Sequence, residues 1–168
     1  LLISTPIMLP LFKDLLGGGC DIGINVKYAE QAKPNGLAEA FIIGQSFIGD
    51  DDCTLILGDN IFYGHGFTDL LAKASARRSG ASVFAYWVAN PQAYGVVDLD
   101  ENGKATKLIE KPIKPTSNWA VTGLYFFDNQ VSKIAASVTP STRGELEITD
   151  VINTYMKNGT WNVEQLGR

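Results

Sequence analysis

A chain of 168 residues fits a single domain and is long enough to bury about 70% of its unfolded surface. With 45% hydrophobic and 19% charged residues, the composition is that of a globular protein rather than a disordered one. The net charge of -4 argues against a general binder of nucleic acid or of anionic membranes, so neither is expected as a partner.

The first half of the chain alternates apolar, β-rich segments with segments of helical periodicity. This alternation is typical of an α/β domain whose sheet is mainly parallel. One segment, 53–57, is a continuous apolar run and predicts a strand buried on both faces of the sheet. In chain order we predict strand 1–4, helix 5–16, strand 25–30, helix 37–48, strand 53–57, helix 67–74 and strand 82–89.

The second half is richer in strands. We predict a hairpin at 96–110, a strand at 120–127, a short helix at 131–138 and a last strand from 161. Thr142 and Glu145 have the spacing of a capping box, which predicts that a helix starts here with Arg143 near its beginning. Because no linker or repeat interrupts the chain, residues 1–168 are predicted to form one domain.

The cysteine and histidine content limits the chemistry. Cys20 and Cys53 match neither metal-ligand nor redox-motif spacing, so we interpret them as a buried, reduced pair in a cytoplasmic protein. His65 is the only histidine, which excludes a site built from several histidines.

The tripeptide Gly58-Asp59-Asn60 directly follows the apolar strand 53–57. At the carboxyl end of a parallel strand, a carboxylate points into the crevice where doubly wound sheets bind ligands. Carboxylate oxygens suit Mg²⁺ beside a phosphate, which makes Asp59 a candidate ligand. The alternative is an Asp-Asn turn after a strand.

Three further segments carry polar side chains that could contact a ligand. Gln31 to Gly36 leads from a strand through Pro-Asn-Gly into a helix, where an amide and backbone groups could read a base edge; a simple helix start is the alternative. Glu110 and Lys111 end the hairpin and could contact a sugar hydroxyl and a phosphate, or form an exposed surface pair. Arg143 could contact a phosphate, although its acidic neighbours equally suit helix capping.

The order of these motifs resembles the glucose-1-phosphate thymidylyltransferases, a family of sugar-phosphate nucleotidylyltransferases. The resemblance covers nearly the whole chain. It is carried by Phe-Ile-Gly at 47–49 with Asp-Asp at 51–52, Leu-Gly-Asp-Asn-Ile-Phe-Tyr-Gly-His at 57–65, Tyr-Gly-Val-Val at 94–97, Glu-Lys-Pro at 110–112, Ala-Val-Thr-Gly-Leu-Tyr-Phe at 120–126 and Arg-Gly-Glu-Leu-Glu-Ile-Thr-Asp at 143–150.

The resemblance implies a fold and a set of site residues. The fold would be a three-layer, Rossmann-like α/β domain of the nucleotide-diphospho-sugar transferase type, with a mainly parallel sheet, a nucleotide-binding half at 1–90 and a β-rich sugar-phosphate-binding half at 91–168. The nucleotide would contact Gln31, Gly36, Leu57 and Asp59, with Asp59 also holding the metal. Glucose 1-phosphate would contact Tyr94, Gly95, Glu110, Lys111, Val121 and Arg143.

The implied reaction is attack of glucose 1-phosphate on the α-phosphorus of dTTP, which gives dTDP-glucose and pyrophosphate. Magnesium is the implied cofactor, and Asp59, Lys111 and Arg143 are the implied catalytic residues. Such a step depends on positioning and charge neutralisation more than on acid-base groups. Homo-oligomers are also expected from the resemblance.

The chain departs from the family at both ends. The glycine-rich signature that handles the triphosphate would precede Leu1, and a second magnesium carboxylate would follow Arg168. We therefore expect a domain truncated at both ends, with little turnover from residues 1–168 alone. The alternatives are a non-catalytic, truncated protein that either binds a nucleotide or sugar phosphate or self-associates, and a uridylyltransferase.

Overall fold

The structure is a computed structural model that describes residues 1–167, and the chain folds as two compact units. The first unit comprises Leu1–Asp50 and Val131–Ile148. The second comprises Asp51–Gln130 and the segment from Thr149 onward. No helix among the described residues has the length and apolar character that crossing a membrane requires.

The first unit is built from short elements. β1 (Leu2–Ser4) and β2 (Tyr28–Glu30) form a parallel two-stranded sheet. The helices are α1 (Leu9–Leu16), the 3-10 turn η1 (Cys20–Ile22), α2 (Glu39–Ile43), α3 (Gln45–Ile48) and α5 (Val131–Ser137). The single helix predicted at 37–48 is divided at Gly44, which caps α2 and begins α3.

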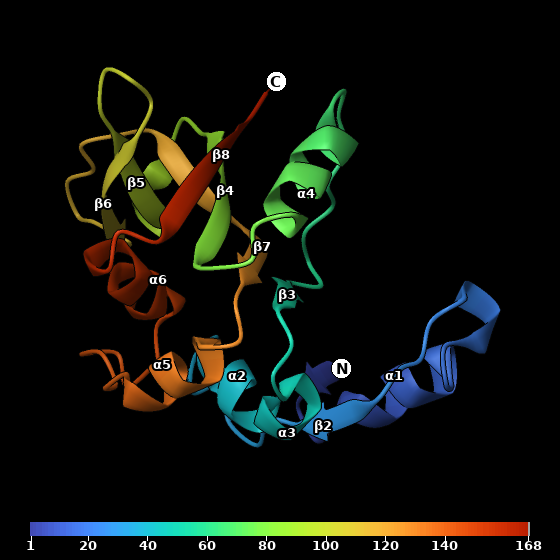
Figure 1. Cartoon of the computed structure of the whole chain (residues 1–168). Helices are drawn as coiled ribbons and strands as arrows, with labels where there is room; N and C mark the ends of the chain where they lie inside the picture. The colour runs from blue at the N-terminus through green and yellow to red at the C-terminus, as the bar shows by residue number, and fades with distance from the viewer. Residues whose placement is uncertain (168) are drawn as a thin grey trace. The chain divides into compact units, whose positions relative to one another are not determined.

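The second unit contains a six-stranded sheet in the order β6-β5-β7-β4-β8, with β3 also paired to β7 (Figure 1). Its strands are β3 (Cys53–Ile56), β4 (Ala81–Trp87), β5 (Gly95–Leu99), β6 (Ala105–Glu110), β7 (Trp119–Phe127) and β8 (Trp161–Leu166). Helix α4 is Phe67–Ser75, the 3-10 turn η2 is Pro91–Ala93, and α6 is Ile148–Lys157.

The larger sheet is mixed, which differs from the expected mainly parallel pairing. β4 and β8 pair in parallel, and β3 runs in their direction because both β3 and β4 are antiparallel to β7. The reversed strand β7 therefore lies between two strands that share one direction. The α/β class is confirmed, whereas most neighbouring pairs in this sheet are antiparallel.

Two helices of the second unit cover opposite faces of the sheet. Phe84 and Phe126 pack with α4 through Phe67 on one face. Phe127 packs on Tyr155 of α6, and successive residues of a strand point to opposite faces. Tyr155 also donates a 2.7 Å hydrogen bond to Asp128. The result is the helix-sheet-helix layering that was predicted.

Strand β3 corrects one prediction. Burial on both faces was expected, but Thr54 is exposed and Ile56 is 60% exposed. Within the described residues β3 pairs with β7 alone, so it is an edge strand with one uncovered face. Cys20 is likewise exposed in η1 rather than buried, although both cysteines are free thiols as predicted.

Candidate functional site

A fork along one edge of β7 organises the candidate site in the second unit. β4 occupies the other edge of β7 along its length. On the fork edge, β3 pairs with the Leu124–Phe127 end, while β5 pairs with Trp119 and Ala120. The stretch 121–123 therefore lies where β3 and β5 separate. The ends of both strands, which carry predicted site residues, meet at this fork.

The loop after β3 enters the fork beside Gly123. Leu57 N–H donates to the Gly123 carbonyl at 2.9 Å, which extends the β3–β7 ladder by one bond. Asn60 closes the loop, because its N–H donates to the Leu57 carbonyl at 3.1 Å. A Cβ on Gly123 would lie 2.7 Å from the Leu57 side chain, so only glycine allows this close approach. Asp59 is exposed on this loop.

The end of the β5–β6 hairpin brings four predicted sugar-phosphate residues together. Gly95 and Glu110 are directly paired across the hairpin. Lys111 N–H donates to the Tyr94 carbonyl at 2.9 Å. A Cβ on Gly95 would lie 3.4 Å from a carboxylate oxygen of Glu110 and 3.1 Å from the methyl group of Thr149. The glycine therefore leaves room beside the Glu110 carboxylate.

Lys111 adopts an unusual backbone conformation. Its φ of 41° makes it the only residue other than glycine with a positive φ among those described. Its Nζ lies 3.9 Å from Glu110 Oε1, and its side chain is 46% exposed. Left-handed backbone at a lysine is costly and concentrates at functional positions. The two charges are thus adjacent, with the ammonium group accessible.

Strand β7 contributes buried side chains next to the fork. Val121 is buried at 8% exposure, and Tyr125, further along the strand, is 4% exposed. Burial, and then the negative charge of Glu110, raises the pKa of Tyr125 well above its ordinary value. The phenol therefore stays protonated, and the carboxylate of Glu110 lies near enough to this buried hydroxyl to influence it electrostatically.

A hollow of about 400 Å³ adjoins the Asp59 loop. Asn60 and Thr122 line it from the loop and from β7, and Tyr86 and Leu166 line it from β4 and β8. Its volume is within the range of small-ligand pockets. Ile61 and Tyr63 on its border are almost fully exposed. The fork therefore opens into space that a ligand could occupy.

Gln31 and Gly36 lie in the first unit and are bonded to each other. Gln31 Nε2 donates to the Gly36 carbonyl at 3.1 Å and to Glu39 Oε2 at 2.7 Å. Asn35 Nδ2 donates to the other Glu39 oxygen at 2.8 Å. Gly36 has a φ of 104° and presses against the backbone of Leu146, so a side chain cannot be accommodated there. The amide donors of Gln31 are held in place by this network.

Arg143 also lies in the first unit, and its predicted setting is wrong. It occupies a turn rather than the start of a helix, because α6 begins only at Ile148. Gly144 has a φ of 78°, which interrupts a helix, so the capping box of Thr142 and Glu145 does not form. The Arg143 guanidinium lies 3.2 Å from Glu145 and 2.8 Å from Glu147.

The acidic residues fit one of two ways of binding a divalent metal. No group of three or more Cys, His, Asp or Glu side chains converges within residues 1–167. Mg²⁺, however, is commonly held by one or two carboxylates together with substrate phosphates. The exposed Asp59 fits that second arrangement.

Sequence reasoning missed the anchors of the site. Gly123 accepts and donates backbone hydrogen bonds at the fork, and Thr149 is buried at 3% exposure against Gly95. Both belong to the motif blocks at 120–126 and 143–150. Their only signals were a glycine within a strand, which suggests close backbone approach, and a short polar residue within an apolar helix.

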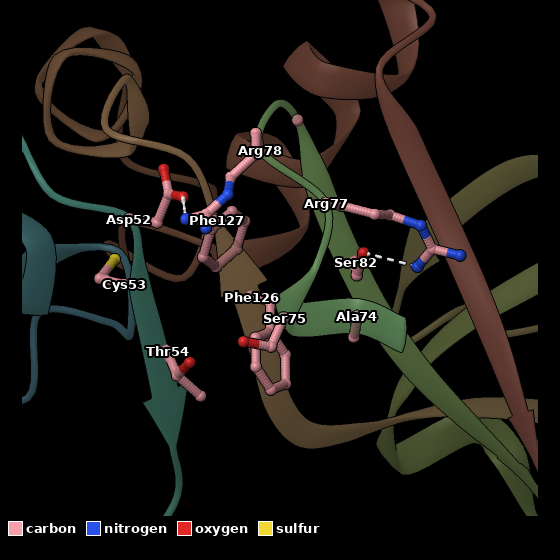
Figure 2. A pocket seen from close by; sticks show the side chains of 11 residues that line it. Asp52, Cys53, Thr54, Ala74, Ser75, Arg77, Arg78, Ser82, Phe126 and Phe127 are labelled. Atoms are coloured by element: carbon pink, nitrogen blue, oxygen red, sulfur yellow. Dashed lines mark hydrogen bonds and ion pairs between the residues drawn. The ribbon is translucent and has the colours of Figure 1, made fainter. Parts of the chain in front are cut away.

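A second hollow lies at the start of β3 rather than at its end. Figure 2 shows it between Asp52, Cys53 and Thr54 on one side and Ser75 and Phe126 on the other. Arg78 Nη1 lies 3.8 Å from Asp52 Oδ2, and Arg77 donates to Ser82 Oγ at 2.9 Å. None of the predicted site residues lines this hollow.

Comparison with known proteins identifies relatives along the whole chain. A family model described as nucleotidyl transferase matches residues 1–168. Glucose-1-phosphate thymidylyltransferases from Xanthomonas campestris pv. campestris (strain B100) and Neisseria meningitidis are 52% identical over 168 residues, and one from Mycolicibacterium smegmatis is 53% identical. All of this chain is covered in each case, but it spans only 57% of the first relative and 58% of the other two.

Solved structures agree on the fold. A Bacillus anthracis protein, provisionally named a glucose-1-phosphate thymidylyltransferase and crystallised with a sucrose, has a TM-score of 0.86 and 33% identity. The match covers 98% of this chain and 66% of that one. A UDP-glucose pyrophosphorylase in complex with UDP-glucose has a TM-score of 0.72 at 23% identity, covering 93% and 64%, and supports the fold alone.

Proposed function

The chain belongs to the nucleotidyl transferase family, and we propose that it takes part in thymidylyl transfer from dTTP to glucose 1-phosphate. The observation that carries this proposal is the 52% identity to a glucose-1-phosphate thymidylyltransferase over all 168 residues. The fork in the second unit supports it, because the ends of β3 and β5 bring a carboxylate loop and a Glu-Lys pair to one edge of β7.

In this proposal the sugar phosphate binds at the end of the β5–β6 hairpin. The Glu110 carboxylate accepts hydrogen bonds from sugar hydroxyls in the space that Gly95 leaves open. Lys111 neutralises the phosphate as a point charge, and its left-handed backbone fixes where the side chain begins. Tyr94 and Val121 complete the contacts, and Arg143 supplies a second cation for the phosphate.

The nucleotide residues keep the roles that the resemblance implies. Gln31 and Gly36 read the thymine base, and the backbone of Leu57 contacts the nucleoside. Asp59 would hold a divalent cation, specifically magnesium, which when bound supplies positive charge to the phosphates. These roles keep nucleotide binding in residues 1–90 and sugar-phosphate binding in 91–168, with Arg143 in the latter.

In the proposed transfer a phosphate oxygen of the substrate is the nucleophile, so no side chain has to accept a proton. A phosphate oxygen of glucose 1-phosphate forms a bond to the α-phosphorus of dTTP, and the bond from that phosphorus to the bridging oxygen breaks. Pyrophosphate leaves with the bonding electrons. The contribution of the chain is to hold the two phosphates in line and to offset their charge.

Ligand-induced stabilisation tests the proposal. With Mg²⁺ present, dTDP-glucose at about 100 times its dissociation constant should stabilise the fold by about 2.7 kcal/mol. Lys111→Met should weaken this effect, whereas Lys114→Met, an exposed lysine three residues away, should leave it unchanged. UDP-glucose is the matched ligand for base specificity and should stabilise less.

Turnover is measured in the same samples as pyrophosphate released from dTTP and glucose 1-phosphate. Release that needs both substrates and Mg²⁺ supports transfer, and residues 1–168 alone are expected to be slow. Absence of any stabilisation by dTDP-glucose would contradict the proposed ligand. Preference for UDP-glucose would instead reassign the base.

Self-association is proposed as well. Several large apolar side chains of the first unit are exposed, including Ile7, Leu11 and Leu15 near or within α1. Exposed apolar surface of this kind is more common at interfaces than on monomers. Sedimentation velocity would show a species heavier than the 18.2 kDa monomer if the proposal holds.

A further inference from the structure

The side chain of Asn60 bridges the backbone of β7 and the carboxylate of Asp59. Asn60 Oδ1 accepts a hydrogen bond from the Gly123 N–H at 3.0 Å. Asn60 Nδ2 donates to Asp59 Oδ1 at 2.7 Å. One planar amide therefore connects a rigid strand to an exposed acidic side chain.

The bridge explains how the loop leaves the sheet. The regular β3–β7 pairing ends at Ile56 and Leu124, and the Leu57–Gly123 bond extends it. The chain then turns away at Gly58, so no backbone carbonyl of β3 continues the ladder. The Asn60 side-chain carbonyl takes that place and satisfies the Gly123 N–H, which is otherwise left without its ladder partner.

The same bridge restricts Asp59. An exposed aspartate on a turn normally samples several rotamers, and holding it in one costs conformational entropy when a ligand binds. The hydrogen bond from Asn60 uses Oδ1 and leaves Oδ2 for another contact. An amide suits this task because it both donates and accepts. An aspartate at position 60 could accept from Gly123 but could not donate to Asp59.

We propose that Asn60 is a positioning residue, which fixes the Asp59 carboxylate by tying it to Gly123, so that Oδ2 is presented to a divalent cation. The inference rests on the proposed function, in which Asp59 holds the cation of a metal–nucleotide complex. Asn60 acts through Asp59. Gly123 is the other required part, because a side chain there would push Leu57 and the loop away from β7.

The test uses Mn²⁺ as a paramagnetic probe in the presence of dTDP-glucose. Enhancement of water proton relaxation distinguishes protein-bound Mn²⁺ from the small metal–nucleotide complex. Asn60→Ala should lower the Mn²⁺ affinity by about 10–100-fold, as removal of a residue that orients a metal ligand generally does. Asp59→Asn should abolish binding. Asn102→Ala, in the exposed turn of the β5–β6 hairpin, is the control and should match the wild type.

A second readout separates positioning from a structural role and does not depend on Asn60→Ala folding. The side-chain amide resonance of Asn60 is followed by NMR. It should shift when Asp59 is changed to Asn, and it should shift in the wild type when Mg²⁺ and dTDP-glucose are added. A residue that only fastens the loop to Gly123 would show at most the small shift that any change beside it causes, not the larger shift of an amide proton that loses its carboxylate acceptor.

Each outcome separates the inference from the proposed function. Wild-type affinity in Asn60→Ala, combined with loss in Asp59→Asn, overturns the positioning role and leaves the proposed function standing. An Asn60 amide resonance that is the same in the wild type and in Asp59→Asn also overturns it. A wild-type protein that binds no Mn²⁺ with dTDP-glucose overturns both.

Discussion

The two ends of β3 each carry an aspartate but hold it differently. Before the strand, Asp52 borders the hollow of Figure 2, where Arg78 lies 3.8 Å from it. After the strand, Asp59 is held by the neutral amide of Asn60. A carboxylate beside a guanidinium is already partly neutralised, whereas one held by an amide keeps its full charge for a cation. The two ends therefore differ in whether a neighbouring cation compensates the aspartate charge. This compensation, rather than the presence of a hollow, distinguishes the start of β3 from the candidate site at its end.

The largest expected effect concerns the aromatic core on one face of the larger sheet, compared with the exposed face of β3. Phe84 is fully buried on β4 and contacts Phe67 and Phe126, which belong to α4 and β7. Phe84→Ala should lower the free energy of unfolding by about 3–5 kcal/mol, because it leaves a cavity in this cluster. Ile56→Ala, on the exposed face of β3, should cost far less. Urea unfolding measures both, and equal losses would contradict the burial described for β3.

Substitutions of the neighbouring Arg77 and Arg78 test the start of β3, where Asp52 lies beside a cation. Arg77 pairs with the buried carboxylate of Glu164, which Lys73 also contacts at 3.0 Å, whereas the Arg78 side chain is 86% exposed. Arg77→Met leaves Glu164 with a single cation and should cost about 1–3 kcal/mol, less than the loss of a fully buried pair. Arg78→Met should change the unfolding free energy by less than about 1 kcal/mol. A larger loss of stability in Arg78→Met than in Arg77→Met, measured by thermal unfolding, would contradict this account.

The smallest expected effect concerns the reactivity of the two thiols, one of which, Cys53, lies at the start of β3. Burial, and then the charges of Asp52 and Asp128, raises the pKa of Cys53 to about 11. Its thiolate fraction at pH 8 is therefore on the order of one in a thousand. Iodoacetamide at pH 8 should label the exposed Cys20 well before Cys53, as peptide mass spectrometry would show. Comparable labelling of both thiols would contradict the burial at the start of β3.

The same shift fixes the sign of a stability effect. The pKa of Cys53 in the fold lies above the ordinary thiol value of 9.0. The protonated thiol therefore stabilises the fold below about pH 9, and that contribution is lost as the pH rises towards 11. Cys53→Ser should remove this part of the alkaline loss of stability.

Much of the second unit was predictable because its signals are local. The hairpin at 95–110 follows from a short turn between alternating strands, and the strand at 119–127 follows from a run of apolar and aromatic residues. The burial of β3 was not predictable, because its pairing partner β7 lies about seventy residues away in the chain. Local composition cannot show whether a strand has one neighbour or two.

The features of the site that the sequence did not predict have similar physical causes. The setting of Arg143 depended on the left-handed Gly144, which breaks the capping-box pattern although the residue types fit it. The left-handed backbone of Lys111 has no sequence signal, since lysine rarely adopts it. The role of Asn60 depends on the backbone of Gly123, which only the folded sheet brings beside it.

Chemical-shift mapping of dTDP-glucose on the 168-residue chain is the measurement that tests the central claim most directly. With Mg²⁺ present, we predict that the largest amide shifts occur at Leu57 to Asn60 and at Tyr94, Gly95 and Lys111 around the fork. Amides of Cys53, Arg77 and Arg78 around the Figure 2 hollow should change little. Shifts concentrated at that hollow, or an unchanged spectrum at saturating ligand, would contradict the assignment of the fork as the nucleotide-sugar site.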